Sequence, residues 1–280
     1  MKFLNKTLEY LLLIEKGKRF FILFLLSLPM GFFASLAMPS HIYVEWLKNF
    51  DVGNKSFLDA FQLAGTQDYL SMIIGVVGVT VFGIITLAIM ATVISRSMRV
   101  GMFKPTRLIK EFNESFFPAL YVAIIYIPVG VLLKVVFTVF LVFWQGMQVV
   151  SAALALSVIT MVLFLIIVAG LISVSVLYMP YMTINGIAPF PAFHTSFSKC
   201  TGETGFKLLN ATALPILVTV VLGALLGFVK ILWVQLLVET LIYSALYTYL
   251  VTLSFVAYYE INDIQREDYP RNYILYKGRK

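Results

Sequence analysis

Charged residues are scarce in this sequence. They make up 12% of the 280 residues, whereas soluble globular domains carry about 25%. This composition excludes an ordinary water-soluble domain, and the mean hydropathy of +0.92 indicates a chain embedded in lipid. Linkers rich in serine and glycine and low-complexity tracts are also missing, so we expect residues 1–280 to form a single integral membrane domain.

Cysteine and histidine are nearly absent as well. Cys200 is the one cysteine, so the chain cannot form an internal disulfide, and no residue pattern pairs this thiol with a catalytic base. The two histidines, His41 and His194, fall on opposite sides of the membrane in the topology inferred below, so they cannot share a zinc or copper ion. The sequence therefore predicts no metal site, no cofactor and no enzymatic activity.

What the sequence has instead is six long apolar segments. A membrane-spanning helix needs about 20 mostly apolar residues, and runs such as Met161–Gly170 lack the alternating polarity of barrel strands. We therefore predict an all-α, polytopic transmembrane bundle. Its six spans are residues 20–38, 70–94, 117–143, 151–178, 208–229 and 235–258, and a tail follows at residues 259–280.

Lysine and arginine are distributed very unequally between the segments that flank these spans. Seventeen lie in residues 1–19, 95–115, 179–207 and 259–280, whereas three lie in the alternate segments. Because basic loops remain on the cytoplasmic side, we predict a multi-pass protein of the cell membrane with both termini in the cytoplasm. Its basic segments would contact anionic lipid headgroups. The net charge of +7 then reflects topology, and nucleic-acid binding is not expected.

Two segments outside the spans have the pattern of amphipathic helices. Residues 4–18 separate leucines from charged residues, which predicts a helix lying on the cytoplasmic leaflet before the chain turns at Gly17. In the external loop, residues 42–50 place Trp46 and other apolar side chains on one face. This second pattern fits either an interfacial helix or a helix packed over the mouth of the bundle.

A weak internal repeat relates two of the cytoplasmic segments. In residues 7–29 and 195–215 alike, a threonine is followed ten residues later by a glycine, then by a basic residue and by an apolar span that contains proline. Each segment would thus be a short surface helix that precedes a span running outward. The repeat predicts three parallel helical hairpins, formed by spans two and three, four and five, and six and one.

The last third of the chain resembles a group of bacterial six-helix membrane proteins. The stretch Ala188–Leu209 is similar to the entry element of the glycerophosphoryl diester phosphodiesterase membrane domain and of YciC-like proteins, and Phe255–Glu267 is similar to their closing element. The closing element is matched at Tyr258, Tyr259, Glu260, Arg266 and Glu267. The resemblance implies a helical integral membrane domain without an assigned activity. The phosphodiesterase domain that some of these proteins carry has no counterpart here.

Two ionisable residues lie well inside predicted spans. Lys134 and Glu239 sit at depths that differ by about one helical turn, and buried charges in membranes are candidate functional sites. We predict that they form an ion pair in the external half of the bundle, which requires spans three and six to be neighbours. The alternative is that each side chain reaches outward, or that Glu239 pairs with Lys230.

Glycines mark two further candidate positions. Gly75, Gly78 and Gly83 lie in span two, and Gly223 and Gly227 form a Gly-x-x-x-Gly motif in span five. Small residues at this spacing allow helices to approach closely. They predict tight helix packing, either within the chain or with a protein partner or a second copy.

These observations favour a non-enzymatic membrane protein that acts as a scaffold, an assembly factor or an accessory subunit of a membrane complex. The alternative is a subunit of a transporter or permease for a small molecule or lipid, with Lys134 and Glu239 lining its path. The polar residues of the spans, apart from Asn210, lie near the external side. They therefore suggest at most an external vestibule, which favours the first function.

Overall fold

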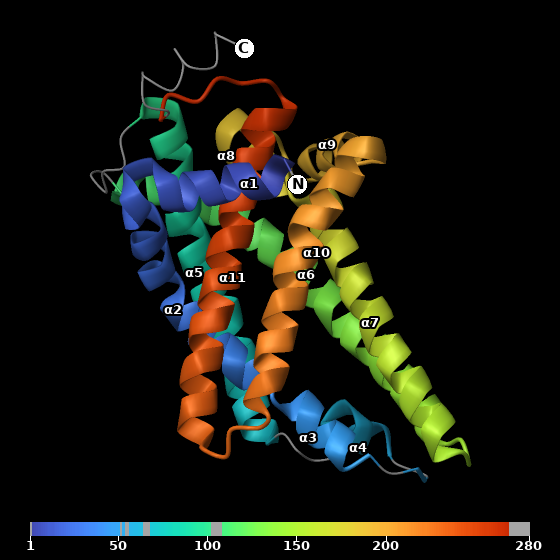
Figure 1. Ribbon diagram of the computed structural model, residues 1–280. Helices are drawn as coiled ribbons and strands as arrows, with labels where there is room; N and C mark the ends of the chain where they lie inside the picture. Colours follow the sequence, from blue (N-terminus) through green and yellow to red (C-terminus); the bar gives the residue numbers. More distant parts are fainter. Residues whose placement is uncertain (1, 51, 54–55, 64–67, 102–107, 269–280) are drawn as a thin grey trace.

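Six long helices dominate the computed structural model, which describes residues 2–50, 52–53, 56–63, 68–101 and 108–268 (Figure 1). They are α2 (Lys18–Ala37), α5 (Tyr69–Val100), α6 (Leu108–Gln145), α7 (Val150–Ser175), α10 (Gly202–Leu226) and α11 (Leu232–Ile261). Each overlaps one predicted span and is long and apolar enough to cross a membrane. The described residues contain no strand. The predicted all-α, six-span fold is confirmed.

The six long helices form a closed ring in chain order. Each packs against the preceding and the following long helix, and α11 returns to pack against α2. The predicted pairs of spans are all in contact, because α5 packs on α6, α7 on α10 and α11 on α2. They are not separate hairpins, however, since α2 also packs extensively on α5. In this ring α6 and α11 stand on opposite sides.

Shorter elements cover both ends of the ring (Figure 1). One end, the terminal face, carries α1 (Lys2–Leu8), η1 (Glu9–Leu13), η2 (Ile14–Gly17), α8 (Tyr178–Asn185), α9 (Pro189–Lys199) and residues 262–268. The other end, the loop face, carries α3 (Ile42–Lys48) and α4 (Phe57–Phe61). The first and last described residues lie on the same face, as an even number of crossings requires.

The predicted N-terminal surface helix is present, but it is attached to the bundle. Tyr10 and Leu11 are buried, and the ammonium groups of Lys2 and Lys6 both form ion pairs with Glu260 at the end of α11. Leu13, by contrast, is 74% exposed. One face of the segment therefore packs across α10 and α11, and only the opposite face is free to contact lipid headgroups.

The chain turns into α2 earlier than Gly17. Glu15, Lys16 and Gly17 have φ angles of 59°, 54° and 79°, so three consecutive residues adopt the left-handed conformation. This conformation costs a non-glycine residue about 1–2 kcal/mol. The Glu15 carboxylate accepts a hydrogen bond from Arg19 at 3.0 Å, which helps to hold the turn. The predicted turn is present, but Glu15 and Lys16 form it together with Gly17.

On the loop face, the predicted helix at residues 42–50 packs over the mouth of the bundle. Ile42 and Trp46 of α3 are 3% and 1% exposed, and α3 contacts α10. Of the two interpretations left open by the sequence, the packed helix is the one observed. Two glycines of α10 leave room for this part of the chain. A Cβ atom at Gly223 would lie 1.9 Å from Oγ of Ser40, in the connector between α2 and α3, and one at Gly227 would lie 2.6 Å from Cβ of Val44 in α3.

The glycines of α5 divide into two kinds. A Cβ atom at Gly75 would lie 2.3 Å from the backbone nitrogen of Ala37, and one at Gly78 would lie 2.1 Å from the Phe33 ring. Gly83 has open space around its Cα. Gly75 and Gly78 therefore allow the close contact of α5 with α2, whereas Gly83 is not needed for helix packing.

Small residues on α2 and α11 make a third close contact, which the sequence analysis missed. Ser27, Gly31 and Ser35 recur every four residues on α2 and face Thr240, Ser244 and Thr248 on α11. Hydroxyl groups bond across this contact, with the Oγ atoms of Ser27 and Thr248 at 3.0 Å. A Cβ atom at Gly31 would lie 2.6 Å from the carbonyl oxygen of Thr240. Both stripes follow the small-x-x-x-small pattern of membrane helices.

Candidate functional site

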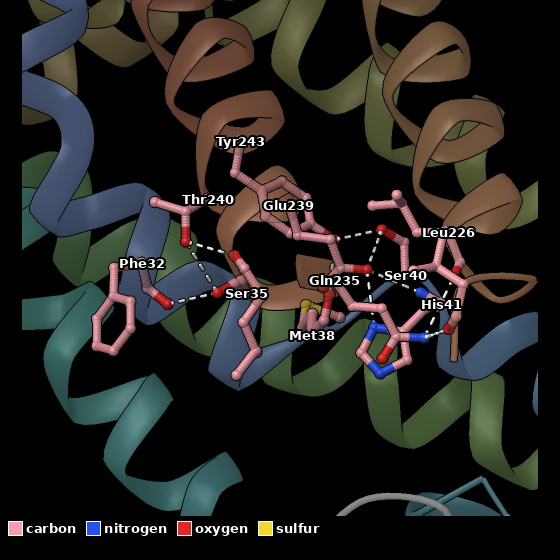
Figure 2. Close-up of polar contacts among 12 residues, drawn as sticks. Phe32, Ser35, Met38, Ser40, His41, Leu226, Gln235, Glu239, Thr240 and Tyr243 are labelled. Carbon is pink, nitrogen blue, oxygen red and sulfur yellow. Dashed lines mark hydrogen bonds and ion pairs between the residues drawn. The ribbon is translucent and has the colours of Figure 1, made fainter. Parts of the chain in front are cut away.

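Glu239 lies at the loop-face end of α11 and is 1% exposed. One carboxylate oxygen, Oε1, accepts a hydrogen bond from the backbone nitrogen of His41 at 2.8 Å and from Ser40 Oγ at 3.2 Å. The Nδ1 atom of His41 lies 3.0 Å from the same oxygen. Figure 2 shows these groups converging from the connector between α2 and α3. A membrane-buried carboxylate is thus held by a segment distant in sequence.

Two further side chains complete what we call the Glu239 cluster: Ser40, His41, Gln235, Glu239 and Tyr243 (Figure 2). The Tyr243 hydroxyl donates to the carbonyl oxygen of Met38 at 2.6 Å and lies 3.1 Å from Ser40 Oγ. Gln235 donates to the carbonyl oxygens of Leu226 and Val229, at 3.1 and 2.8 Å, and so closes the turn between α10 and α11. The cluster joins three parts of the loop face by hydrogen bonds.

The second carboxylate oxygen of Glu239 differs from the first. Oε2 is buried and has no hydrogen-bond partner among the described residues. Buried polar atoms are paired in the great majority of cases. Oε2 is therefore the atom of the cluster with the capacity to accept one more donor.

Lys134 is not part of this cluster, so the predicted Lys134–Glu239 ion pair is wrong. The Lys134 ammonium lies 3.3 Å from Met72 Sδ and 4.4 Å from the centre of the Phe61 ring. The sequence placed the two charges at similar depths, but depth does not determine which helices are neighbours. The ring puts α6 and α11 on opposite sides, and α4 packs over Lys134.

We expect Lys134→Ala and Glu239→Ala to act independently. Glu239→Ala removes the acceptor for His41 and Ser40 and should lower the free energy of unfolding by about 1–3 kcal/mol. Lys134→Ala should have a smaller effect, and the double variant should equal the sum of the two within about 0.5 kcal/mol. Unfolding in detergent measures all three. Partial recovery of stability in the double variant would indicate that the two charges interact after all.

A second buried polar group occupies the terminal face, and the sequence analysis did not identify it. The Asp268 carboxylate accepts from Arg19 Nη1 at 2.6 Å and from Arg266 at 3.0 Å (Nε) and 2.8 Å (Nη2). The side chain of Asp268 is fully buried, and those of Arg19 and Arg266 are 1% and 2% exposed. We call these residues, with Glu15 and Tyr10, the Asp268 cluster.

Tyr10 connects the Asp268 cluster to the rest of the terminal face. Its ring lies beneath both guanidinium groups, with the Arg19 and Arg266 Cζ atoms 4.7 and 5.2 Å from the ring centre. Its hydroxyl forms a 2.5 Å hydrogen bond with Ser97 of α5. The cluster therefore joins the N-terminal segment, α2, α5 and residues 266–268. In the sequence, Arg266 appeared only as a matched position of the closing element and Arg19 only in the count of basic residues, because Arg19 lies 249 residues from Asp268.

The terminal face also contains a small polar cavity between α5, α6, α8 and α11. Its volume is about 30 Å³, and Arg99, Glu114, Thr183 and Tyr259 are among its lining residues. Ligand pockets for small molecules have volumes of about 300–1,000 Å³. The cavity has room for water molecules rather than for an organic substrate.

The remaining candidates for chemistry are isolated. Cys200 is buried between α9 and α10, and burial raises the pKa of its thiol to about 11, so the reactive thiolate is rare at neutral pH. Within the ranges that the structure describes, no three His, Cys, Asp or Glu side chains come together in a group that could hold a metal ion. His41 lies on the loop face, and His194 lies on α9 at the terminal face.

The two clusters each join segments that are distant in the sequence, through hydrogen bonds among their members and to neighbouring groups such as the carbonyl oxygens of Met38 and Leu226 and the Ser97 hydroxyl. The resemblance to the six-helix bacterial families includes Arg266, which the structure places in the Asp268 cluster, but this resemblance stays a prediction. Comparison of the chain with models of protein families, with curated proteins and with solved structures gave no match.

Proposed function

We propose that this integral membrane protein is a non-enzymatic scaffold, assembly factor or accessory subunit of a membrane complex. The observation that carries the proposal is the separation of the Glu239 and Asp268 clusters, at opposite ends of the ring. Between them, the contact of α2 with α11 consists of small residues and hydroxyl groups bonded to one another or to carbonyl oxygens. This arrangement favours a packed bundle that presents surfaces over one that conducts a solute.

The terminal face is the docking surface in this proposal, and we place it in the cytoplasm because of its basic segments. Single-cysteine labelling tests the placement. An impermeant maleimide should label Lys230→Cys on the loop face of intact cells, whereas Lys199→Cys should react only after the membrane is permeabilised. The native thiol gives little background, because Cys200 is buried. Labelling of Lys199→Cys in intact cells would reverse the topology.

Purification in mild detergent tests the accessory role. A triple variant, Lys16→Gln/Lys18→Gln/Lys199→Gln, removes exposed cations of the terminal face, and Lys230→Gln removes one from the loop face as a matched control. We expect wild type and the control to co-purify with the same protein in a fixed ratio, and the triple variant to lose it. A wild-type chain that purifies alone under these conditions would contradict the proposal.

One observation favours the second candidate, a subunit of a transporter for a small molecule or lipid. Oε2 of Glu239 is buried and lacks a hydrogen-bond partner among the described residues, and buried carboxylates in membranes are often part of transport paths. Liposomes containing the purified chain would test this function. Flux of a solute or of a fluorescent phospholipid that Glu239→Ala abolishes, and Glu203→Ala at the exposed end of α10 preserves, would support transport.

A further inference from the structure

Helix α9 has an unusual distribution of side chains. Its buried face consists of small residues, since Ala192 and Ser196 are fully buried and Ser196 Oγ donates to the carbonyl oxygen of Val174 in α7 at 3.0 Å. Two phenylalanines dominate its exposed face: Phe190 is 91% exposed and Phe197 51% exposed, and the exposed His194 lies one turn from each. The two phenylalanines are seven apart and so lie on one side of the helix. α9 is therefore amphipathic, with its large apolar residues directed away from the protein.

Different residues flank the aromatic face on its two sides. Phe193, one turn from Phe190, is 37% exposed and packs edge-on against Tyr178 of α8, with ring centres 5.7 Å apart. On the other side of the helix, Ser198 is exposed and polar. Leaving a phenylalanine side chain in water rather than burying it costs about 1.5–3 kcal/mol. A face with two such residues is expected to be covered in the working protein.

The position of α9 indicates what covers it. In Figure 1, α9 lies on the outer side of the bundle, at the terminal-face ends of α7 and α10. Phe206, in the first turns of α10, is 65% exposed. Beyond the exposed Asn210, the same side of α10 becomes apolar, with Leu214 44% and Leu217 56% exposed. The aromatic face of α9 thus lies beside a surface that must contact lipid acyl chains.

We propose that α9 is an interfacial helix whose Phe190 and Phe197 side chains insert into the lipid leaflet at the terminal face. Aromatic residues on one face and polar residues on the other are typical of helices that lie in the plane of the membrane interface. The short Ala192 and Ser196 side chains let the helix rest closely on α7, which sets its height relative to the spans. In this arrangement α9 contacts lipid at the terminal face in addition to the N-terminal segment, in which Leu13 is 74% exposed.

Spin-label accessibility in the intact protein tests this proposal. Phe190→Cys, Phe197→Cys and, as the control on the same helix, Ser198→Cys would each be made in a Cys200→Ser background and labelled with a nitroxide. The proteins would be reconstituted in vesicles of phosphatidylcholine and phosphatidylglycerol. All three changes are at exposed positions, and gel filtration in detergent would establish that each variant remains folded.

The proposal predicts several-fold greater accessibility to oxygen, and several-fold lower accessibility to a water-soluble nickel chelate, at positions 190 and 197 than at 198. Equal access of the chelate to all three positions would place the aromatic face in water and overturn the proposal. Exclusion of both reagents from positions 190 and 197 would overturn it as well, because it would show that protein, from a partner or a second copy, covers the face.

Discussion

Asp268→Asn is expected to destabilise the protein more than any other single polar change. The Asp268 carboxylate is the shared acceptor for Arg19 and Arg266, and all three side chains are buried. Asparagine would remove the negative charge that the two guanidinium groups share, while Arg19 would keep its ion pair with Glu15. Removing one partner of a buried ion pair typically costs about 3–5 kcal/mol. Thermal unfolding in detergent, monitored by circular dichroism, should show a large decrease in the midpoint.

Glu267→Gln provides the matched control for this prediction. Glu267 is the adjacent acidic residue, its side chain is exposed, and it contacts α5 through its backbone nitrogen, which donates to the carbonyl oxygen of Met98 at 2.9 Å. Its neutralisation should leave the unfolding midpoint nearly unchanged. Equal effects of Asp268→Asn and Glu267→Gln would mean that general charge on the tail, rather than the Asp268 cluster, stabilises the terminal face.

Gly75→Ala is expected to produce the second large effect. The added methyl carbon would lie 2.3 Å from the backbone nitrogen and 2.7 Å from the Cα atom of Ala37, and backbone atoms of a packed helix cannot move aside easily. Overpacking of this kind costs about 1–3 kcal/mol. We expect a lower unfolding midpoint, measured in the same detergent as for Asp268→Asn.

Gly83→Ala is the control on the same helix. The space around the Gly83 Cα is open, and alanine favours helix over glycine by about 0.8–1 kcal/mol. Its carbonyl oxygen, which accepts from the Tyr247 hydroxyl at 3.0 Å, is unaffected by the substitution. Gly83→Ala should therefore be neutral or slightly stabilising. If it were as harmful as Gly75→Ala, the assignment of these two glycines to different roles would be wrong.

The contrast between Gly75 and Gly83 shows what the sequence predicts and what it leaves open. Length and hydropathy determine which segments cross a membrane, because about 20 apolar residues are needed to do so whatever surrounds them. The six spans were therefore predictable. A glycine motif predicts close packing in general, but it does not identify the partner. At Gly223 and Gly227 the partner is a connector and a short helix, which no spacing rule for helix pairs describes.

The candidate sites were less predictable for a physical reason. The cost of burying Glu239 could be inferred from its position in a span, and the structure does bury it. Its partner, His41, lies 198 residues away and was considered only as a metal ligand. Which charges meet depends on the order of helices in the ring, and this order is set by contacts such as Gly31 on Ser244 that depth does not reveal. The repeated small residues of α2 and α11 were the available signal.

Disulfide cross-linking tests the closed ring most directly. Ser35→Cys and Thr240→Cys would join α2 to α11 at positions where the native hydroxyl oxygens are 3.4 Å apart, and Lys134→Cys with Glu239→Cys would probe α6 against α11, all in a Cys200→Ser background. With a mild oxidant in native membranes, the ring predicts rapid formation of the 35–240 disulfide and none between 134 and 239. Rapid formation of the 134–239 disulfide without the 35–240 disulfide would contradict a ring in which α11 lies beside α2 and opposite α6.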